Sequence, residues 1–365
     1  MLPSSTFLST VHSQMRIALL NRTLWSQKHL TGGLRLGARW SVRPNGNAPT
    51  PLAMAWYLTH ACPEQCDFCN VSRSLEVEYP TLNSADAFEL IHRMVPKIPV
   101  VALGGGEPMA HPNVLPIIRR IHERRGRVFL VTSGTTVGRA KAKALCDEHP
   151  EMVMVSLLGD ESTHDERMGR KGAFNRTLAV IENIGRYRNP KRTRLIVNCT
   201  VSPNEIGILD SVIQIARDVG VDALRFSWLS FMSPSENEML PKAEPYFILP
   251  QTDVDSFDWR SMWKKVLEIK RKHTDLVQFL PALNEREFKQ WFGGRGVERA
   301  CLSLWHTLFV RPDGSVVPCG HMQEDSLGDL LSQPLEEIWN SSRFTQLRMA
   351  QRQKPFQMCG RCCKV

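Results

Sequence analysis

Three cysteines stand close together at Cys62, Cys66 and Cys69, in the run CPEQCDFC. Their CxxxCxxC spacing supplies three thiolates to a metal centre. A closed structural zinc site takes four protein ligands, whereas soft thiolates at short, uneven spacing favour an iron–sulfur cluster. A four-iron cluster held by three cysteines keeps one iron open, and an open iron can chelate a cofactor.

A glycine-rich run, Gly104-Gly105-Gly106-Glu107-Pro108, follows an apolar stretch at 100–103. Together with the cysteine motif and the aromatic Phe68 before its last cysteine, this run resembles the radical S-adenosylmethionine (radical SAM) superfamily. Two downstream segments, 152–156 and 164–174, are similar to the fourth strand and the following loop of these enzymes. The similarity covers about residues 52 to 230.

The resemblance implies a [4Fe–4S] cluster on Cys62, Cys66 and Cys69 together with S-adenosylmethionine (SAM), which the reduced cluster cleaves to methionine and a 5′-deoxyadenosyl radical. It implies that Phe68 packs near the adenine, that the glycine run binds the amino group, and that polar residues contact the ribose and the carboxylate. The implied SAM contacts are Phe68, Gly104, Gly105, Gly106, Glu107, Pro108, Ser133, Ser156 and Arg167, with Thr132, Gly134 and Asn198 as weaker candidates. Each also has a purely structural interpretation as turn, cap or core residue.

Four cysteines near the C-terminus form a second group, in which Pro312-Asp313-Gly314 indicates a hairpin turn between the first two and a CxxC pair supplies the last two. This pattern resembles the auxiliary-cluster domains of radical SAM enzymes, the SPASM and the shorter Twitch types. The resemblance implies one additional [4Fe–4S] cluster, with zinc as the competing metal and Cys363 as an alternative to the last ligand. The implied ligands are Cys301, Cys319, Cys359 and Cys362.

Composition is that of an ordinary soluble enzyme, with 365 residues, 42% hydrophobic and 23% charged. No apolar run approaches the roughly 20 residues of a membrane span. The ten cysteines cluster at metal-like spacings, which favours a reducing, cytoplasmic location. Two of them, Cys146 and Cys199, stand alone and are expected to be small buried hydrophobes.

The N-terminal region, 1–50, is basic and lacks Asp and Glu. Three interpretations are open: a basic arm with a true start at Met15, a transit peptide, or an interfacial helix in which Ile17, Leu20 and Leu24 contact a membrane surface. No stacking or groove-reading motif accompanies the basic residues, so nucleic acid is not an expected partner.

From Leu52 onward, short apolar runs alternate with longer amphipathic stretches, which predicts parallel strands with crossover helices. The expected strands are 53–58, 100–103, 127–132, 152–157, 195–201 and 223–229. The expected helices are 84–95, capped by Ser84, 113–125, 138–148, 172–187 and 205–219, ended by Gly220. This pattern predicts an α/β fold, a partial (β/α)6 TIM-like barrel with a small C-terminal auxiliary-cluster domain, with the chemistry at the carboxyl ends of the strands.

The expected domains are a basic extension at 1–50, a radical SAM core at 51–232, a substrate-capping region at 233–298 and the auxiliary-cluster domain at 299–365. Several aromatic residues of the capping region are candidates to close over a ligand, and two residues of the sixth strand are candidates to bind substrate. They are Tyr246, Phe247, Trp259, Trp263, Trp291 and Phe292, and Arg225 and Trp228.

An auxiliary cluster can accept an electron from a substrate radical, so a two-electron or bond-forming oxidation is the leading reaction, with rearrangement or decarboxylation open. The short region before the first strand lacks a winged-helix peptide-recognition domain, which favours a small molecule of the amino-sugar or nucleoside type. A peptide maturase and a non-catalytic electron-transfer protein are the alternatives, and Glu107 argues against the second. The expected electron donor is a flavodoxin or ferredoxin.

Overall fold

The computed structural model describes residues 45–69, 80–203, 205–234, 255–294, 296–299, 301–323 and 325–362. The interpretations offered for the basic N-terminal region lie outside these residues. So do the expectations for Tyr246, Phe247 and Cys363. In the described part of the chain, no helix combines the length and the apolar character that crossing a membrane takes.

One ten-stranded sheet runs through the molecule, in the order β10-β9-β8-β1-β2-β3-β4-β5-β6-β7. All neighbours from β8 to β7 are parallel, and β9 and β10 add antiparallel edges. The strands are β1 (Ala53–Thr59), β2 (Val100–Gly105), β3 (Arg127–Thr132), β4 (Met152–Ser156), β5 (Arg194–Val201), β6 (Ala223–Trp228), β7 (Val277–Leu280), β8 (Thr307–Val310), β9 (Ser315–Val317) and β10 (Gly328–Asp329).

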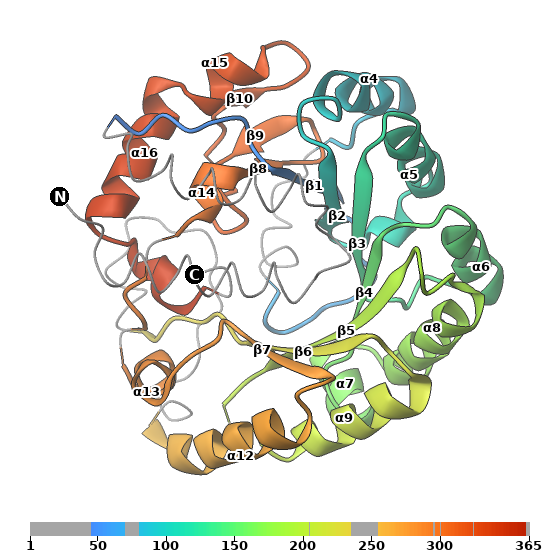
Figure 1. The fold of residues 1–365 in the computed structure, drawn as a ribbon, viewed down its shortest axis with the longest axis vertical. Helices are drawn as coiled ribbons and strands as arrows, with labels where there is room; N and C mark the ends of the chain where they lie inside the picture. The colour runs from blue at the N-terminus through green and yellow to red at the C-terminus, as the bar shows by residue number, and fades with distance from the viewer. Residues whose placement is uncertain are drawn as a thin grey trace.

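The predicted partial barrel with a C-terminal domain is confirmed. All six predicted strands form, and two further parallel strands, β7 and β8, extend the wall to eight. Sequence reasoning missed β7 and β8 because each is only four residues long. Figure 1 shows the parallel strands as a curved wall with helices on its outer side.

The helices from α4 to α13 lie between successive parallel strands and pack their apolar faces on the outside of the wall, whereas α15 and α16 follow the last strand. They are α4 (Ser84–Met94), α5 (Val114–Glu123), α6 (Arg139–Asp147), α7 (Glu161–Arg167), α8 (Ala173–Tyr187), α9 (Ile208–Val219), α12 (Trp259–Lys272), α13 (Glu285–Gly293), α14 (Ser303–His306), α15 (Leu335–Trp339) and α16 (Ser342–Gln353), with short 3₁₀ turns η1 (Pro108–Ala110) and η2 (Gln357–Arg361).

Two helix ends were predicted from single residues. The N-cap of α4 is Asn83, not Ser84, because the Asn83 side chain accepts the backbone N–H of Asp86 at 3.0 Å. Gly220 ends α9 as predicted, in the left-handed conformation with φ 70°.

Successive side chains of each strand point to opposite faces of the sheet. In β6, Leu224, Phe226 and Trp228 join the main hydrophobic core under the outer helices. The opposite face of the wall has its own smaller cluster, made of Met152, Ile196 and Ala223 with Phe129 and Met154. The barrel therefore has an inner face, called the lumen face below, that is separate from the main core.

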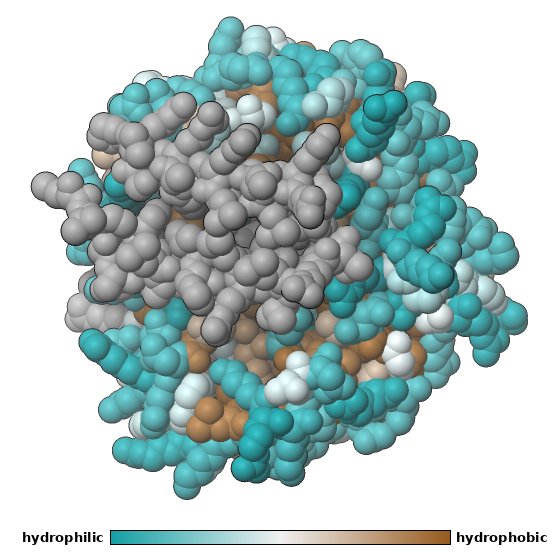
Figure 2. Space-filling model, viewed as in Figure 1, coloured by the Kyte–Doolittle hydropathy of each residue, from teal (hydrophilic) through white to brown (hydrophobic). Residues whose placement is uncertain are grey.

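Figure 2 shows the same view in space-filling form. Hydrophilic residues cover most of the rim formed by the outer helices, and hydrophobic residues reach the surface further inward. This distribution fits a wall whose helices bury one face and present the other to water.

The C-terminal part joins the same sheet. β8 pairs in parallel with β1, with Ala53 opposite Thr307. The predicted hairpin forms between β8 and β9, where the Gly314 N–H donates to the Arg311 carbonyl and Gly314 has φ +86°. The two halves of the chain thus share one continuous hydrogen-bonded ladder through β1 and β8.

Arg348 on α16 is fully buried and connects the C-terminal part of the chain to the rest of the structure. Its guanidinium donates to the carbonyls of Leu304 and Gly46 and lies 4.2 Å from the ring centres of both Trp339 and Phe344. The arginine therefore links the segment before β1, helix α14 ahead of β8 and the last long helix.

We expect Arg348→Met to lower the free energy of unfolding by about 2 kcal/mol or more, because two buried carbonyl groups lose a charged donor. Urea unfolding measures the change. Arg352→Met, on the exposed side of the same helix, is the matched control and should leave the unfolding midpoint almost unchanged. Equal effects of both substitutions would contradict the structural role of Arg348.

Candidate functional site

The cysteine loop follows β1 and lies against the end of α7. Its backbone is fixed there by two hydrogen bonds, from Gln65 N–H to the Met168 carbonyl and from Asp67 N–H to the Arg167 carbonyl. The Cys66 sulfur lies 3.3 Å from the Met168 sulfur. The loop is therefore held at the carboxyl ends of the strands, as predicted.

The three thiols of this loop interact electrostatically. Burial, together with the charges of Glu107, Cys69 and Glu64, raises the pKa of Cys62 to about 11. Burial, and then the charges of Cys69 and Cys62, also raises the pKa of Cys66. Thiols this reluctant to ionise carry their protons until a metal displaces them.

The nine cysteines that the structure describes are all free thiols. Among the described residues, no three His, Cys, Asp or Glu side chains converge as a ready-made site for a single metal ion. An iron–sulfur cube does not require such a compact group, because each of its cysteines binds a different iron. The donor set in the loop, three adjacent thiols, is the one that such a cube uses.

The glycine run packs directly against the start of the cysteine loop. Gly106 N–H donates to the Thr59 carbonyl, and Glu107 N–H donates to the Ala61 carbonyl. A Cβ on Gly106 would lie 2.4 Å from the Ala61 oxygen, and Gly105 has φ +116°. Glycine is required at both positions for β2 to meet the loop, whereas a Cβ on Gly104 would meet nothing within 4 Å.

Glu107 is fully buried and ties β2 to β3. Its carboxylate accepts hydrogen bonds from Met109 N–H at 2.8 Å, and from the Thr132 hydroxyl, the Ser133 N–H and the Ser133 hydroxyl at 2.7 Å each. Four bonds match the acceptor capacity of a carboxylate. That Glu107 binds the amino group of SAM, and that Ser133 contacts its ribose, stay predictions. In this structure the two residues bind each other.

A chain of hydroxyl groups leads from Glu107 to a second buried carboxylate, Glu64, inside the cysteine motif. The Ser133 hydroxyl lies 3.1 Å from the Thr135 hydroxyl, which donates to Glu64, and Arg170 pairs with the same Glu64 oxygen at 3.1 Å. The other Glu64 oxygen is buried without a partner among the described residues. Sequence reasoning missed this chain, and the only signal for it was an acidic residue between two metal-type cysteines.

Arg167 ends α7 and connects the cysteine loop to the β5–α9 loop. One guanidinium nitrogen donates to the Thr200 carbonyl at 2.7 Å and pairs with Glu205 at 2.9 Å, and Asp67 lies 3.9 Å from another. The guanidinium also covers the Phe68 ring at 4.5 Å. Its Nη2 is buried without a partner in the described structure, so one donor of the predicted carboxylate fork is available.

Several carboxylates lie around the cysteine loop in the described part of the chain. Those of Glu64 and Glu107 are buried, that of Glu205 is half-buried and that of Asp67 is exposed. Arg170 pairs with Glu64, and Arg167 pairs with Glu205 and lies near Asp67. A buried carboxylate is unfavourable unless hydrogen bonds or a cation compensate its charge, so the Glu64 oxygen that has no partner among the described residues is suited to a positively charged ligand.

A polar rung crosses the lumen face next to these residues. Register places Ser156 beside Asn198 and Asn198 beside Arg225. The Ser227 hydroxyl donates to the Asn198 oxygen at 2.7 Å. Contact of Ser156 and Asn198 with SAM stays a prediction.

Trp228 lies on the opposite face. Its indole is 2% exposed, donates to the Pro281 carbonyl and stacks on Phe279 at 5.2 Å. Because side chains alternate along a strand, Trp228 packs in the core while Arg225 faces the lumen. The substrate-binding role suggested for Trp228 is therefore replaced by a packing role.

The described aromatic residues of the expected capping region also pack in the core. Trp291 and Phe292 on α13 have no exposed surface, and Trp263 on α12 is 9% exposed. Trp259 is partly buried against the same core. These side chains hold α12 and α13 on the sheet rather than lining an open site.

The C-terminal cysteines gather from three segments of the chain. Burial, followed by the charges of Cys301 and Cys319, raises the pKa of Cys359, so these three thiols interact. Cys359 and Cys362 lie at one 3₁₀ turn, where Cys362 N–H donates to the Cys359 carbonyl. Thiols of this kind are the donors that an iron–sulfur cluster uses, so the chemistry of the set fits a second cluster.

The segment after Cys319 packs against the end of β1. A Cβ on Gly320, the residue after Cys319, would lie 2.3 Å from the Tyr57 hydroxyl oxygen. Tyr57 belongs to β1, opposite Gly104 in the ladder. The side chains of His60 and Gln323 are also hydrogen-bonded, and burial lowers the pKa of His60. The segment that carries Cys319 therefore lies beside the strand that leads into the cysteine loop.

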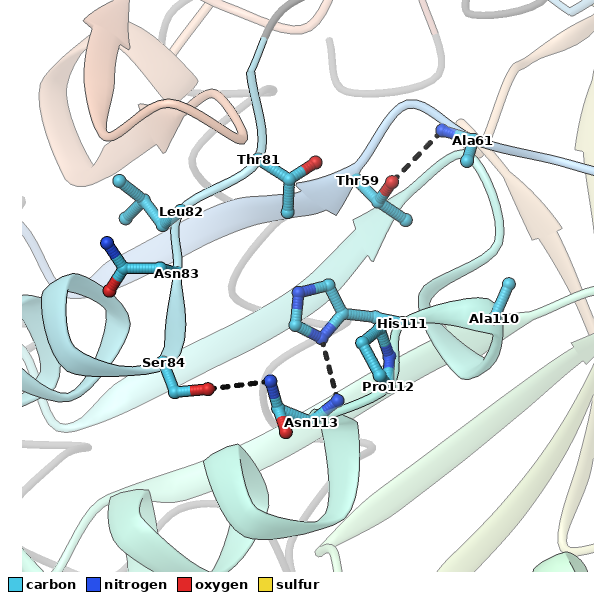
Figure 3. Close-up of a pocket in the computed structure, with 10 residues that line it drawn as sticks. All are labelled: Thr59, Ala61, Thr81, Leu82, Asn83, Ser84, Ala110, His111, Pro112 and Asn113. Atoms are coloured by element: carbon cyan, nitrogen blue, oxygen red, sulfur yellow. Dashed lines mark hydrogen bonds between the residues drawn. The ribbon is translucent and has the colours of Figure 1, made fainter.

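A pocket of ≈ 470 Å³ lies beside the cysteine loop, between the starts of α4 and α5. Figure 3 shows His111 at its centre, accepting the Asn113 backbone N–H, and the Asn113 amide donating to Ser84. The lining residues are Thr59, Ala61, Thr81, Leu82, Asn83, Ser84, Ala110, His111, Pro112 and Asn113. Apart from His111, all the lining residues are uncharged. Burial lowers the pKa of His111.

Comparison with known proteins places this geometry in context. A family model described as the radical SAM superfamily matches residues 56–227, and the SPASM model, described as an iron–sulfur cluster-binding domain, matches residues 301–363. An AdoMet-dependent heme synthase of Methanosarcina barkeri is 27% identical over 86% of this chain and 87% of its own length. The PqqA peptide cyclase of Ruegeria pomeroyi is 26% identical over 81% of this chain and 75% of its own.

Among solved structures, Streptococcus suis SuiB bound to S-adenosylmethionine has a TM-score of 0.62 and 14% identity, covering 93% of this chain and 79% of that one. At this identity the likeness concerns the fold. Its extent covers both the barrel and the C-terminal part, in agreement with the shared sheet.

We expect Glu107→Gln to lower the free energy of unfolding by about 1–3 kcal/mol, because an amide nitrogen cannot accept the Ser133 N–H. We also expect the affinity for SAM to fall, because the substitution removes one negative charge beside the cysteine loop. Urea unfolding and equilibrium dialysis measure the two effects. Glu123→Gln, at the exposed end of α5, is the control. Unchanged stability in Glu107→Gln would contradict the buried network.

A buried histidine, His164 on α7, supplies a pH test. It accepts the Leu158 N–H at 3.0 Å, and burial lowers its pKa from 6.5 to about 4. His164 binds a proton more tightly in the unfolded chain than in the folded one. The stability that the neutral, buried His164 contributes is therefore fully present above pH 6.5 and is lost as the pH falls toward 4. When the pH is lowered from 7.5 to 5.5, we expect the free energy of unfolding of the wild type to fall by about 1 kcal/mol more than that of His164→Asn. Urea unfolding at the two pH values measures both changes. Exposed His92→Asn should behave like the wild type; a wild-type loss no larger than that of His164→Asn would contradict this account.

Proposed function

Since this chain belongs to the radical SAM superfamily and carries a SPASM iron–sulfur cluster-binding domain, we propose that it is an oxidising radical SAM enzyme that acts on a carbon of a small molecule. The proposal rests on one observation above all. Three thiols, a glycine run without side chains and two buried carboxylates, those of Glu64 and Glu107, meet at the carboxyl ends of β1 to β3.

The residues present fit the two cofactors that the family implies. Cys62, Cys66 and Cys69 would hold a [4Fe–4S] cluster and leave one iron open. SAM carries a sulfonium and an ammonium group, both of which would be attracted to the carboxylates around the cysteine loop. The unpartnered Nη2 of Arg167 supplies a donor for the SAM carboxylate.

When bound, the cluster and SAM supply a 5′-deoxyadenosyl radical that takes a hydrogen atom from a substrate carbon. The chain itself has to position and shield that event. The bonds from Gln65 and Asp67 to the end of α7 keep the cysteine loop in place, and Glu107 holds the ends of β2 and β3 at a fixed distance.

The C-terminal cysteines support an oxidation. Cys301, Cys319, Cys359 and Cys362 would hold an auxiliary [4Fe–4S] cluster with every iron ligated. A cluster of this kind accepts an electron, and the contact of Tyr57 with Gly320 puts Cys319 next to β1. Loss of a second electron from the substrate is therefore the favoured outcome over a redox-neutral rearrangement. A flavodoxin or ferredoxin is the proposed electron donor, and the cytoplasm the proposed location.

For the substrate we favour a small molecule over a peptide. The match to the heme synthase spans 87% of that protein, against 75% of the PqqA peptide cyclase. This similarity moves the proposal from an amino sugar or nucleoside toward a tetrapyrrole. Maturation of a peptide is the second candidate, because the peptide cyclase is 26% identical over most of this chain.

We expect the protein, reconstituted anaerobically with iron and sulfide, to bind about eight irons per chain and to release 5′-deoxyadenosine from SAM on reduction. Cys66→Ala should bind about four irons and release none, because the open iron is lost. Cys319→Ala should bind about four and still cleave SAM. Iron analysis and chromatography of the nucleoside measure both.

The matched control is Cys146→Ala, which removes a buried cysteine of α6 that lies in neither group. It should retain both the iron content and SAM cleavage. Formation of 5′-deoxyadenosine by Cys66→Ala would reject the assignment of the SAM-cleaving cluster to the cysteine loop. No 5′-deoxyadenosine from the fully loaded wild type would reject the proposal in favour of a plain electron-transfer role.

A further inference from the structure

A buried carboxylate, that of Glu64, stands inside the cysteine motif itself. Glu64 comes two residues after Cys62 and two residues before Cys66. Its side chain is only 1% exposed, whereas glutamate is almost never fully buried unless its charge is paired. A neutral side chain at this position would cost the fold less free energy.

The charge of Glu64 is compensated on one side only. Its Oε1 accepts the hydroxyl of Thr135 and pairs with Arg170 Nη1 at 3.1 Å. Its Oε2 is buried and has no partner among the described residues. The Arg170 side chain is 41% exposed, so water weakens its attraction for the carboxylate. Within the described structure, Glu64 therefore keeps a large part of its negative charge.

Glu64 acts on two sulfurs of the cysteine loop. Its backbone N–H donates to the sulfur of Cys62. Burial is the main reason why the pKa values of Cys62 and Cys66 are raised, and the charge of Glu64 contributes to both shifts. The bonds to Thr135 and Arg170 hold the carboxylate in this place, so its charge is fixed beside the metal-binding thiols.

A fixed charge beside an iron–sulfur cluster changes how readily the cluster takes up an electron. The reduction potential depends on the net charge around the cluster, on hydrogen bonds to its sulfurs and on its exposure to water. Because reduction adds negative charge, a buried carboxylate disfavours the reduced form and lowers the potential. The N–H bond to Cys62 acts in the opposite sense, but every residue except proline supplies that bond, so the side chain is what distinguishes Glu64.

We propose that the Glu64 carboxylate keeps the reduction potential of the loop cluster low, and that Arg170 limits this effect. The loop cluster is the [4Fe–4S] cluster on Cys62, Cys66 and Cys69, and the inference rests on that part of the proposed function. The donor, a flavodoxin or ferredoxin, supplies one electron, and no covalent bond forms or breaks. A lower potential makes the reduced cluster a stronger reductant for SAM, so Glu64 acts through the cluster and touches no substrate.

The test follows the reduced clusters of the fully loaded protein by electron paramagnetic resonance, without SAM, while the solution potential is changed in steps. The signal that Cys66→Ala lacks belongs to the loop cluster. Glu64→Gln keeps an oxygen for Thr135 and Arg170 and removes only the charge. At a fixed potential we expect its ratio of reduced to oxidised loop cluster to be about tenfold higher than in the wild type, a shift of about 59 mV for one electron.

Arg170→Met removes the compensating cation, so it should shift the potential in the opposite direction, toward more negative values. The shift should be smaller than that of Glu64→Gln, because Arg170 is partly in water. Arg170 lies at the surface, so this variant tests the inference even if Glu64→Gln does not fold. Glu166→Gln is the matched control: it removes an exposed carboxylate of α7, and it should leave the potential unchanged.

Three results would overturn the inference: an unchanged potential in a fully loaded Glu64→Gln, shifts of the same sign in Glu64→Gln and Arg170→Met, and a shift in Glu166→Gln as large as that in Glu64→Gln. A purely structural role of Glu64 predicts the first or the second. No signal that depends on Cys66 would overturn this inference and the proposed function together. The expected shifts without formation of 5′-deoxyadenosine would reject the proposed function alone.

Discussion

The buried carboxylate of Glu107 is the interaction on which the arrangement of the site depends. It accepts four hydrogen bonds from the turn after β2 and from the end of β3, while its own N–H holds the loop that follows β1. Three parallel strands are therefore joined at their carboxyl ends by one residue, through its side chain and its backbone N–H. A charged group in such a place is stable only when all its bonds are made, so the loops that carry the cysteines and the glycines have little freedom to separate.

Sharing of one sheet by the two halves of the chain explains how a second cluster can lie near the first. β8 continues the wall beside β1, and the turn after β9 brings Gly320, the residue after Cys319, against Tyr57. Arg348 and its aromatic neighbours then secure the C-terminal helices over this junction. Because the ladder of β1 and β8 is rigid, the distance between the two cysteine groups is set by the fold and does not depend on a linker.

The sequence by itself determined the features that are local in the chain: the CxxxCxxC and CxxC spacings, the six longer strands with their crossover helices, the hairpin at Gly314 and the end of α9 at Gly220. Each of these depends on neighbours within a few residues, so composition and periodicity were sufficient. Only the tertiary structure decided which groups meet across the barrel. It joined β7 and β8 to the wall, gave Glu107 its partners on β3, linked Glu64 to Arg170, turned Trp228 into the core and Arg225 into the lumen, and placed Gly320 against Tyr57. These contacts depend on strand register and on closure over long stretches of chain, and a sequence pattern that specifies an alternation of faces does not specify which strands become neighbours.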